Sequence, residues 1–367
     1  MRSKKSVKAA AVQATQPLSP PARRRSSKEG FGLTGYTIFA IITLAIMMLC
    51  IAVGSVNVPL SDTINVLWNA LRRAPQEINH FAPIIISARL PRVLCVALVG
   101  ASLSIGGAAM QGLLKNPLAD GTTLGVSSGA SLGAITAIVF GITIPALPFS
   151  GTVVMAIAFA LLSLVIILSL AYRLDYSMST NTIILLGVIY SMFASSVVAL
   201  LTTFAGERVR HITFWLMGSL AGSSYANALM LLVALIIFGG ILWGCARELN
   251  AFAIGEDNAR HIGVNVRRIK LMVLISVSVL IGVCVSVSGT IGFVGLVTPH
   301  MLRMIVGPNH RRLLPASLFG GACFLMLADL IARVLLSPRE LPIGVVTSLV
   351  GALVFILIFF RSKKKIL

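Results

Sequence analysis

Long apolar runs recur along most of this 367-residue chain and decide in which solvent it can fold. A helix needs about 17 to 25 mainly apolar residues to cross a hydrocarbon layer of roughly 30 Å. Ten runs of this kind cover residues 36–56, 93–112, 122–140, 152–171, 181–204, 226–245, 270–288, 291–306, 316–336 and 341–360. With 57% hydrophobic and 11% charged residues, the chain has too little polar surface to cover them in water. We therefore expect an all-α polytopic membrane protein with ten transmembrane helices.

Basic residues are distributed unequally between the two sides that these runs define. If the N-terminus is cytoplasmic, most of the 30 Lys and Arg residues lie inside. The outside segments hold Arg72, Arg73, Arg89, Arg92, Arg208, Arg210, Arg333 and Arg339. The positive-inside rule expects this asymmetry, so both termini are predicted to be cytoplasmic. The eighth run is short and contains Pro299; without it the last two spans would be reversed.

The chain ends are predicted to be basic tails rather than binding modules. Residues 1–35 are rich in Ser, Ala, Pro, Lys and Arg and predict a disordered cytoplasmic tail, and residues 362–367 a short basic one. The first apolar run is too long for the core of a cleaved signal peptide and should remain as a span. A nucleic-acid partner would require a clustered basic face with aromatic residues, which the sequence lacks. The net charge of +19 is explained by topology instead.

Catalytic and metal-binding patterns are missing from the sequence. It has no HExxH, no paired-cysteine motif and no GxxxxGK loop, and its five cysteines are scattered. Asp329 is the only acid well within a predicted span, four residues before Arg333, so a functional charge and a structural ion pair are both open. His300 is expected to be a packing residue. We therefore expect no catalytic residue, metal site or cofactor, and any ATP must be hydrolysed by another chain.

Three polar or amphipathic segments stand between the predicted spans. Leu60–Leu71 and 207–225 have the pattern of helices at the outer interface of the membrane. The cytoplasmic stretch from Leu249 has Glu256 and Asp257 at a helix start and Gly263 as a stop. It predicts one short polar helix, about 249–263, for docking a partner. Small residues such as Gly100, Ser104 and Ala108 are spaced for close helix packing.

A series of short motifs carries a resemblance to a known family. In chain order they are Arg89-Leu90-Pro91-Arg92, Asn116-Pro117-Leu118-Ala119, Leu124-Gly125-Val126-Ser127-Ser128-Gly129, Phe214-Trp215-Leu216-Met217-Gly218, Gly292-Phe293-Val294-Gly295-Leu296, Asn309-His310-Arg311, Ala328-Asp329 and Leu341-Pro342-Ile343-Gly344-Val345. Together, over residues 36–361, they resemble the permeases of ABC importers for iron-siderophores, haem and cobalamin. Asp257-x-Ala259-x-x-x-Gly263 is similar to the coupling signature of such permeases. Thr290 departs from the pattern, which usually has proline there.

The resemblance implies a type II ABC importer permease in the cell membrane, most simply with an iron-siderophore as cargo and with haem or cobalamin as alternatives. It implies four kinds of partner: a second permease subunit, two cytoplasmic ATPases, an extracytoplasmic substrate-binding protein, and membrane lipid. Arg89, Arg92 and Arg333 match the arginines that dock the binding protein. Ala253, Gly255, Glu256, Asp257, Ala259 and Gly263 match the segment that couples to the ATPase. The competing class is an ion-coupled secondary transporter, for which Asp329 with Arg333 would be the ion-coupling group.

Overall fold

The computed structural model describes residues 30–54, 56, 58–72, 80–121, 124–144, 151–176 and 178–363. Over these ranges the regular structure is entirely helical, as the apolar runs predict. Most of the expected N-terminal tail, residues 1–29, lies outside the described residues, as do residues 364–367 of the C-terminal one. The first helix begins at Leu33, so the predicted end of the tail at residue 35 is three residues late.

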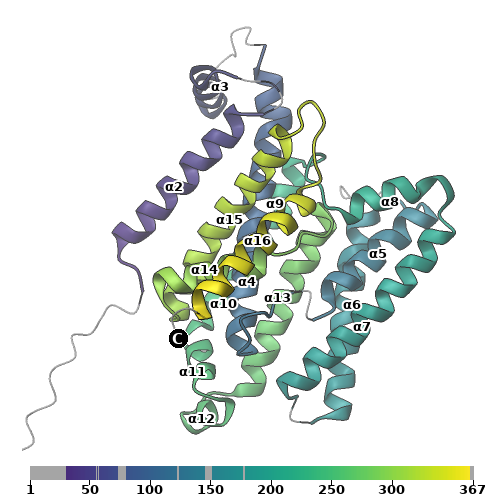
Figure 1. Cartoon of the computed structure of the whole chain (residues 1–367), viewed down its shortest axis with the longest axis vertical. Coiled ribbons are helices and arrows are strands. Elements are labelled where there is room, and N and C mark those ends of the chain that lie inside the picture. The colour runs from purple at the N-terminus through teal and green to yellow at the C-terminus, as the bar shows by residue number, and fades with distance from the viewer. Residues whose placement is uncertain are drawn as a thin grey trace, which may run out of the picture.

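Seven helical stretches are long and apolar enough to cross a membrane (Figure 1). They are α2 (Leu33–Ala52), Ile84–Leu113, α6 (Gly151–Leu174), α7 (Thr180–Thr203), Tyr225–Gly244, α13 (Val266–Ser288) and α15 (His310–Val334). Three further apolar helices are α5 (Val126–Phe140), α14 (Val294–Val306) and α16 (Ile343–Lys363). Each predicted run coincides with one of these helices or stretches.

Two of the long stretches contain a π-helical turn. Ile84–Arg89 (η1) continues directly into α4 (Leu90–Leu113), and Pro91, which has no N–H to donate, lies immediately after the π-helical turn. The second span therefore starts at Ile84, earlier than the predicted residue 93. In the sixth span, η3 (Leu235–Gly239) joins α9 (Tyr225–Ala234) to α10 (Gly240–Gly244).

The α13–α14 connection keeps its break despite the missing proline. α13 ends at Ser288 and α14 begins at Val294, after Phe293 in a left-handed conformation with φ of 68°. The Thr290 hydroxyl donates a hydrogen bond to the Leu216 carbonyl. A side-chain contact thus holds this loop at the position where the motif pattern described above usually has proline.

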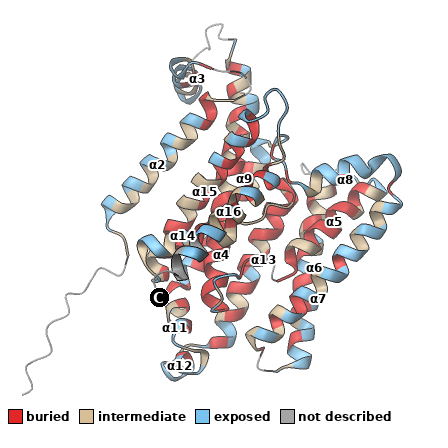
Figure 2. Cartoon of the chain, in the orientation of Figure 1, coloured by how far each residue is buried: buried red, intermediate tan, exposed pale blue. Residues whose placement is uncertain are grey.

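The centre of the molecule is the packed pair α4 and α15, which Figure 2 shows as largely buried. Their backbones touch at two glycines. A Cβ added to Gly321 would lie 2.3 Å from the Gly100 carbonyl oxygen, and one added to Gly100 would lie 2.3 Å from that of Gly321. The small-residue face predicted at Gly100 and Ser104 is therefore the contact on α15. In lipid, such close backbone approach takes the place of a hydrophobic driving force.

A second group of helices, α5, α6 and α7, packs beside this centre (Figure 1). α5 lies directly against α6, because a Cβ on Gly133 would be 2.2 Å from the Met155 carbonyl oxygen. The group adjoins the centre through α13, which contacts α5 and α6. We call α5–α7 the side group.

Two amphipathic helices lie at one end of the molecule, as predicted. α3 (Leu60–Arg72) buries Thr63 and Val66 and exposes Leu60, Ile64 and Trp68 along its other face. α8 (Val209–Leu216) covers that end of α5. We refer to this end as the α3 end, and to the opposite one, which carries α11 (Ala246–Ala253) and α12 (Glu256–His261), as the α12 end (Figure 1).

Candidate functional site

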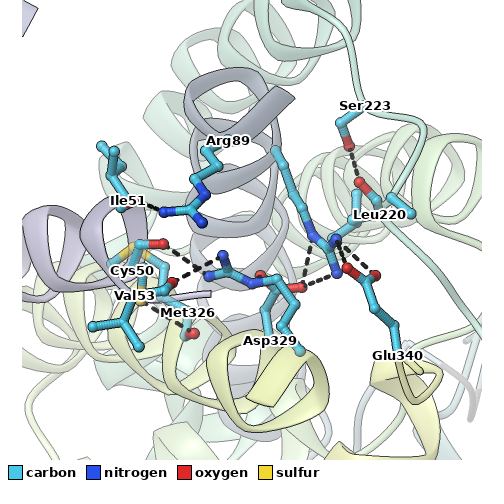
Figure 3. A network of polar contacts seen from close by, with 12 residues as sticks. Cys50, Ile51, Val53, Arg89, Leu220, Ser223, Met326, Asp329 and Glu340 are labelled. Carbon is cyan, nitrogen blue, oxygen red and sulfur yellow. Dashed lines mark hydrogen bonds and ion pairs between the residues drawn. The ribbon is translucent and has the colours of Figure 1, made fainter. Parts of the chain in front are cut away.

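Two arginines from other helices cap the C-terminal end of α2 (Figure 3). The last carbonyls of a helix have no partner within it and carry the negative end of its dipole. The Arg89 Nη1 donates to the carbonyls of Ile51 and Ala52, both at 2.8 Å. The Arg333 Nη2 donates to the carbonyl of Cys50 at 2.9 Å. Because α2 has no basic residue in its own last turn, these guanidinium groups supply its cap.

Asp329 connects the same arginines to the start of α4. Its Oδ1 accepts hydrogen bonds from Nε and Nη2 of Arg92, at 3.1 and 2.9 Å. Its Oδ2 lies 2.9 Å from Nε of Arg333. Arg92 also reaches Glu340, with Nη1 2.8 Å from Oε2. We call Arg89, Arg92, Asp329, Arg333 and Glu340 the arginine network; its three positive charges face two negative ones.

The structure brings together all three arginines predicted for docking, but buries two of them. Arg89 and Arg333 are only 7% and 4% exposed, so in this conformation their guanidinium groups serve the chain itself. Arg92 lies closer to the surface, and Glu340 is the most exposed member of its ion pairs. The Asp329–Arg333 pair predicted from helical spacing is present. Glu340 was not indicated by the sequence, because it lies 248 positions from Arg92 and no local spacing links them.

The polar segment predicted as one helix over 249–263 is two helices, and this prediction was wrong. α11 ends at Ala253 and α12 begins at Glu256, with Gly255 between them at φ of 117°. Residues with a side chain rarely adopt that conformation, so the glycine sets the break. Gly263, predicted as the stop, follows α12 with φ of 89°. We call residues 246–263 the α11–α12 hairpin.

α11 is anchored to the start of α15 by a pair of side-chain amides. Asn250 Nδ2 donates to Asn309 Oδ1 at 2.9 Å. Asn250 Oδ1 accepts from the backbone N–H of His310 at 2.8 Å. A Cβ on Gly112 of α4 would lie 2.2 Å from the His310 ring, so this ring is enclosed as well. The Asn309-His310 motif therefore fixes the hairpin to the central pair.

The residues predicted for coupling divide into an exposed and a buried set. Ala253, Asp257 and Gly263 are exposed, and two large apolar side chains, Ile254 and Ile262, are about 60% and 63% exposed beside them. Ala259, in contrast, is completely buried and is a packing residue. Exposed isoleucines at the end of an otherwise polar hairpin are typical of a surface that a partner covers.

Glu256 is turned away from this surface toward two other helices. Its Oε2 lies 2.8 Å from Nζ of Lys270 in α13, and its Oε1 accepts from the Thr180 hydroxyl at the start of α7, at 3.3 Å. The Lys270 ammonium also donates to the Met178 carbonyl at 3.0 Å. Lys270 is 2% exposed and was not predicted as a functional residue. The signal available in the sequence was its positive charge at the first residue of the apolar run 270–288.

A cavity of about 780 Å³ lies between the side group and the helices α4, α13, α14 and α16. Its lining includes Ser127 and Ser128 of α5, Ser195 of α7 and Ser348 of α16. Their four hydroxyls make no hydrogen bond within the described ranges, so they are available to a bound molecule. No lysine, arginine or histidine is among the described residues that line this cavity.

Comparisons with known proteins match nearly the whole chain. Residues 42–361 match the model of the FecCD transport family. An uncharacterized ABC transporter permease protein of Bacillus subtilis, YvrB, is 41% identical over 93% of this chain and 96% of its own length. The hemin transport system permease protein HmuU of Yersinia pestis is 37% identical over 88% and 95%. Other matches are permeases of cobalamin and molybdate import systems.

A solved structure agrees with these matches. It is described as an inward-facing conformation of a metal-chelate type ABC transporter. The TM-score is 0.77 at 30% sequence identity, and the match covers 89% of this chain and 99% of the other. The arrangement of helices is therefore shared along with the sequence.

Proposed function

Because the chain belongs to the FecCD transport family and is an ABC importer permease of the cell membrane, we propose that it passes a metal chelate, first of all an iron-siderophore, into the cytoplasm. The observation that carries this proposal is the match over residues 42–361, which begins within α2, ends within α16 and covers every apolar helix between them. An ion-coupled secondary transporter is not favoured, since Asp329, its coupling candidate, is already held by two arginines.

The proposed topology has ten spans with both termini inside. The α12 end is then cytoplasmic, and the α3 end extracytoplasmic. This orientation is supported by the basic residues Arg247, Arg260, Arg267 and Arg268 around the α11–α12 hairpin. It also places the amphipathic helices α3 and α8 at the outer interface of the membrane.

ATP hydrolysis belongs to a partner, and the α11–α12 hairpin is the proposed contact with it. Ile254 and Ile262 supply exposed apolar side chains, and Asp257 supplies charge next to them. Amides of α11 fix the hairpin to α15, so a force applied by an ATPase would reach the central helices. Two ATPase subunits and a second permease subunit would complete the transporter.

An extracytoplasmic binding protein is proposed to dock at the α3 end. Arg92 is the best placed arginine of the network, because its partner Glu340 is partly exposed and could give way to a carboxylate from outside. Arg89 and Arg333 would contribute by shaping this end of α2 and α15. If either is to bind the partner directly, it must first release the carbonyls of α2.

The cargo is proposed from the cavity. Ser127, Ser128, Ser195 and Ser348 offer hydroxyls that can donate to or accept from the polar groups around a chelated metal. Three of the matched relatives are named as permeases of hemin, cobalamin and molybdate systems, so the cargo differs among similar permeases. A lining with free hydroxyls and no basic side chain among its described residues fits a neutral chelate better than an oxyanion.

Competitive uptake tests the cargo. Cells that depend on this permease should take up a ⁵⁵Fe-labelled ferric hydroxamate, and an excess of unlabelled ferric hydroxamate should suppress the signal while cobalamin, hemin and molybdate do not. Deletion of the permease should abolish the uptake. Uptake of cobalamin, hemin or molybdate that depends on the permease, without uptake of the ferric hydroxamate, would replace the iron-siderophore assignment.

A further inference from the structure

Three polar contacts connect α12 and α13 to the start of α7 and the turn before it. Nζ of Lys270 lies between Oε2 of Glu256 at 2.8 Å and the carbonyl oxygen of Met178 at 3.0 Å. The second carboxylate oxygen of Glu256 accepts from the Thr180 hydroxyl. We call these four residues the lysine clamp. It joins one residue each of α12 and α13 to the α6–α7 turn and the first residue of α7.

The lysine clamp is well suited to transmit force because its ammonium is enclosed. Lys270 is 2% exposed, and Glu256 keeps only part of its surface in contact with solvent. An ammonium removed from water must keep its partners, since losing one leaves a buried charge uncompensated. A displacement of α12 therefore moves the α6–α7 turn with it rather than simply stretching the contacts.

The α6–α7 turn is held by α13 at a second point. The Arg267 guanidinium lies over the rings of Tyr172 and Tyr176, 5.0 and 5.6 Å from their centroids. These rings are exposed, so this contact is more easily broken than the buried one. Arg268, the next residue, is exposed, and its side chain makes no hydrogen bond, ion pair or ring contact within the described ranges.

The lysine clamp is connected to the wall of the cavity through α7. α7 packs on α5 and α6 within the side group. Ser195 and Val198 of α7 line the cavity on one side, and Ile281 of α13 and Ser348 of α16 line it from the other helices. The hairpin, the clamp and one wall of the cavity thus form a continuous mechanical connection, in which Lys270 and Thr180 are the links to α7.

We propose that Lys270, with Glu256 and Thr180, positions the side group relative to the α11–α12 hairpin, so that ATP-driven movement of the hairpin changes the width of the cavity. This inference rests on the proposed function, because it takes the hairpin as the contact with the ATPase. Lys270 and Thr180 are positioning residues: neither lines the cavity, and Lys270 is too buried to meet the ATPase.

The test measures how accessible one residue of the cavity wall is to a reagent, and it needs no cargo. In the complex purified with its ATPase subunits, the five native cysteines are replaced and a single one is introduced by Ser195→Cys. The rate of its reaction with a water-soluble maleimide is measured without nucleotide and with ATP plus vanadate. ATPase activity and melting temperature are measured on the same samples. The variants are Lys270→Met, Thr180→Val, both together, and Lys270→Arg.

With the lysine clamp intact, ATP should change the labelling rate several-fold. Lys270→Met should abolish most of this change while ATP is still hydrolysed, Thr180→Val should reduce it, and the double variant should remove it. Lys270→Arg, which keeps the charge and can still reach both partners, should retain it. The matched control, Arg268→Met, should behave like the parent.

Two outcomes would overturn this inference alone, and a third would overturn the proposed function together with it. If Lys270→Met and the double variant lower the melting temperature but leave the ATP-dependent change intact, the clamp is merely structural. If Arg268→Met has the same effect as Lys270→Met, the loss is not specific to the clamp. If the parent complex neither hydrolyses ATP nor changes its labelling rate, the proposed function itself fails, and the inference with it.

Discussion

Asp329 is the residue on which the α3 end of the molecule depends most. Its side chain is 1% exposed, and its two oxygens face Arg92 and Arg333. Each guanidinium continues to another element: Arg333 to the last turn of α2, and Arg92 to Glu340 beyond α15. One carboxylate thus balances two cations, the buried Arg333 and the partly buried Arg92, that hold three segments together, so its loss affects more than one helix.

Removing this charge should destabilise the protein strongly. Asp329→Asn leaves two guanidinium groups short of a counter-charge, and breaking a buried pair in this way costs about 3–5 kcal/mol. We expect a clear drop in the melting temperature of the detergent-purified permease. The matched change Glu340→Gln, at a partly exposed carboxylate, should cost no more than about 1 kcal/mol. Equal losses for the two variants would contradict the assigned roles.

The part of Arg92 in docking can be tested without breaking its pair with Asp329, by changing its second partner, Glu340. If Arg92 meets a carboxylate of the binding protein, Glu340→Gln should free it and tighten docking. An exposed ion pair contributes about 0.2–1 kcal/mol, so the affinity should change by about 1.4- to 5-fold. Calorimetry with the purified binding protein measures this. Weaker docking in Glu340→Gln would show that Glu340, not Arg92, serves the partner.

Local spacing predicted some of these contacts and could not predict the others. Asp329 and Arg333 are one helical turn apart, so their pairing follows from the sequence. Arg92 is 237 positions from Asp329, and only the packing of α4 on α15 brings the two together. The burial of Arg89 depends on the residue at which α2 ends and leaves its last carbonyls without a partner inside the helix. Side-chain patterns do not reveal this residue.

Helix packing at the centre depends on glycines that act as pairs across an interface. α4 and α15 approach so closely at Gly100 and Gly321 that a Cβ on either would meet a backbone carbonyl. A backbone cannot rotate away as a side chain can, so the whole helix would have to shift. The spacing of small residues predicted which face of α4 is used, although not which helix faces it.

Gly321→Ala should therefore impair folding. Overpacking of a close interface typically costs about 1–3 kcal/mol. Gly240→Ala is the control, because Gly240 is also helical but has nothing within 4 Å of its added Cβ. It should be neutral or gain up to about 1 kcal/mol. Folded yield and melting temperature in detergent report the difference, and a well-folded Gly321→Ala protein would mean that the two helices can separate at no cost.

The α11–α12 hairpin is the element whose exposed side should determine ATPase binding. Ile254→Asp with Ile262→Asp places charge on the apolar part of this surface and should release the ATPase subunits during co-purification. The permease alone should keep its melting temperature, since both side chains are largely exposed. Ile305→Asp, at an exposed apolar residue of α14, is a comparison site outside the hairpin. ATPase retention in the double variant would exclude the hairpin as the contact.

The prediction of a single helix over 249–263 rested on the polar residues of this segment and its stop at Gly263, and it gave no helix-breaking role to Gly255. The φ of 117° makes it a break, which turns Glu256 toward Lys270 and leaves Asp257 outside. The same break explains why Ala259, predicted as a coupling residue, is buried. Periodicity predicts that a polar segment is helical, but not how a left-handed glycine redirects it.

At the scale of the whole molecule, the fold was the most predictable part. Apolar length alone indicated each of the long apolar helices, because the thickness of the hydrocarbon layer sets how long a crossing helix must be. The division into a central pair and a side group was not predictable, since it arises from which small-residue faces meet. The cavity between them follows from that division, and so does the importance of the lysine clamp.

The central proposal is that this chain is one of two permease subunits whose movement is driven by ATP hydrolysed on partner subunits. The most direct measurement is uptake of a ⁵⁵Fe-labelled ferric hydroxamate into proteoliposomes that contain the permease, its ATPase subunits with ATP enclosed, and its binding protein outside. We predict uptake that requires enclosed ATP, stops with vanadate and persists when ion gradients are collapsed. Uptake that continues without ATP or without the ATPase subunits, and ceases when the ion gradient is collapsed, would contradict the account and favour a secondary transporter.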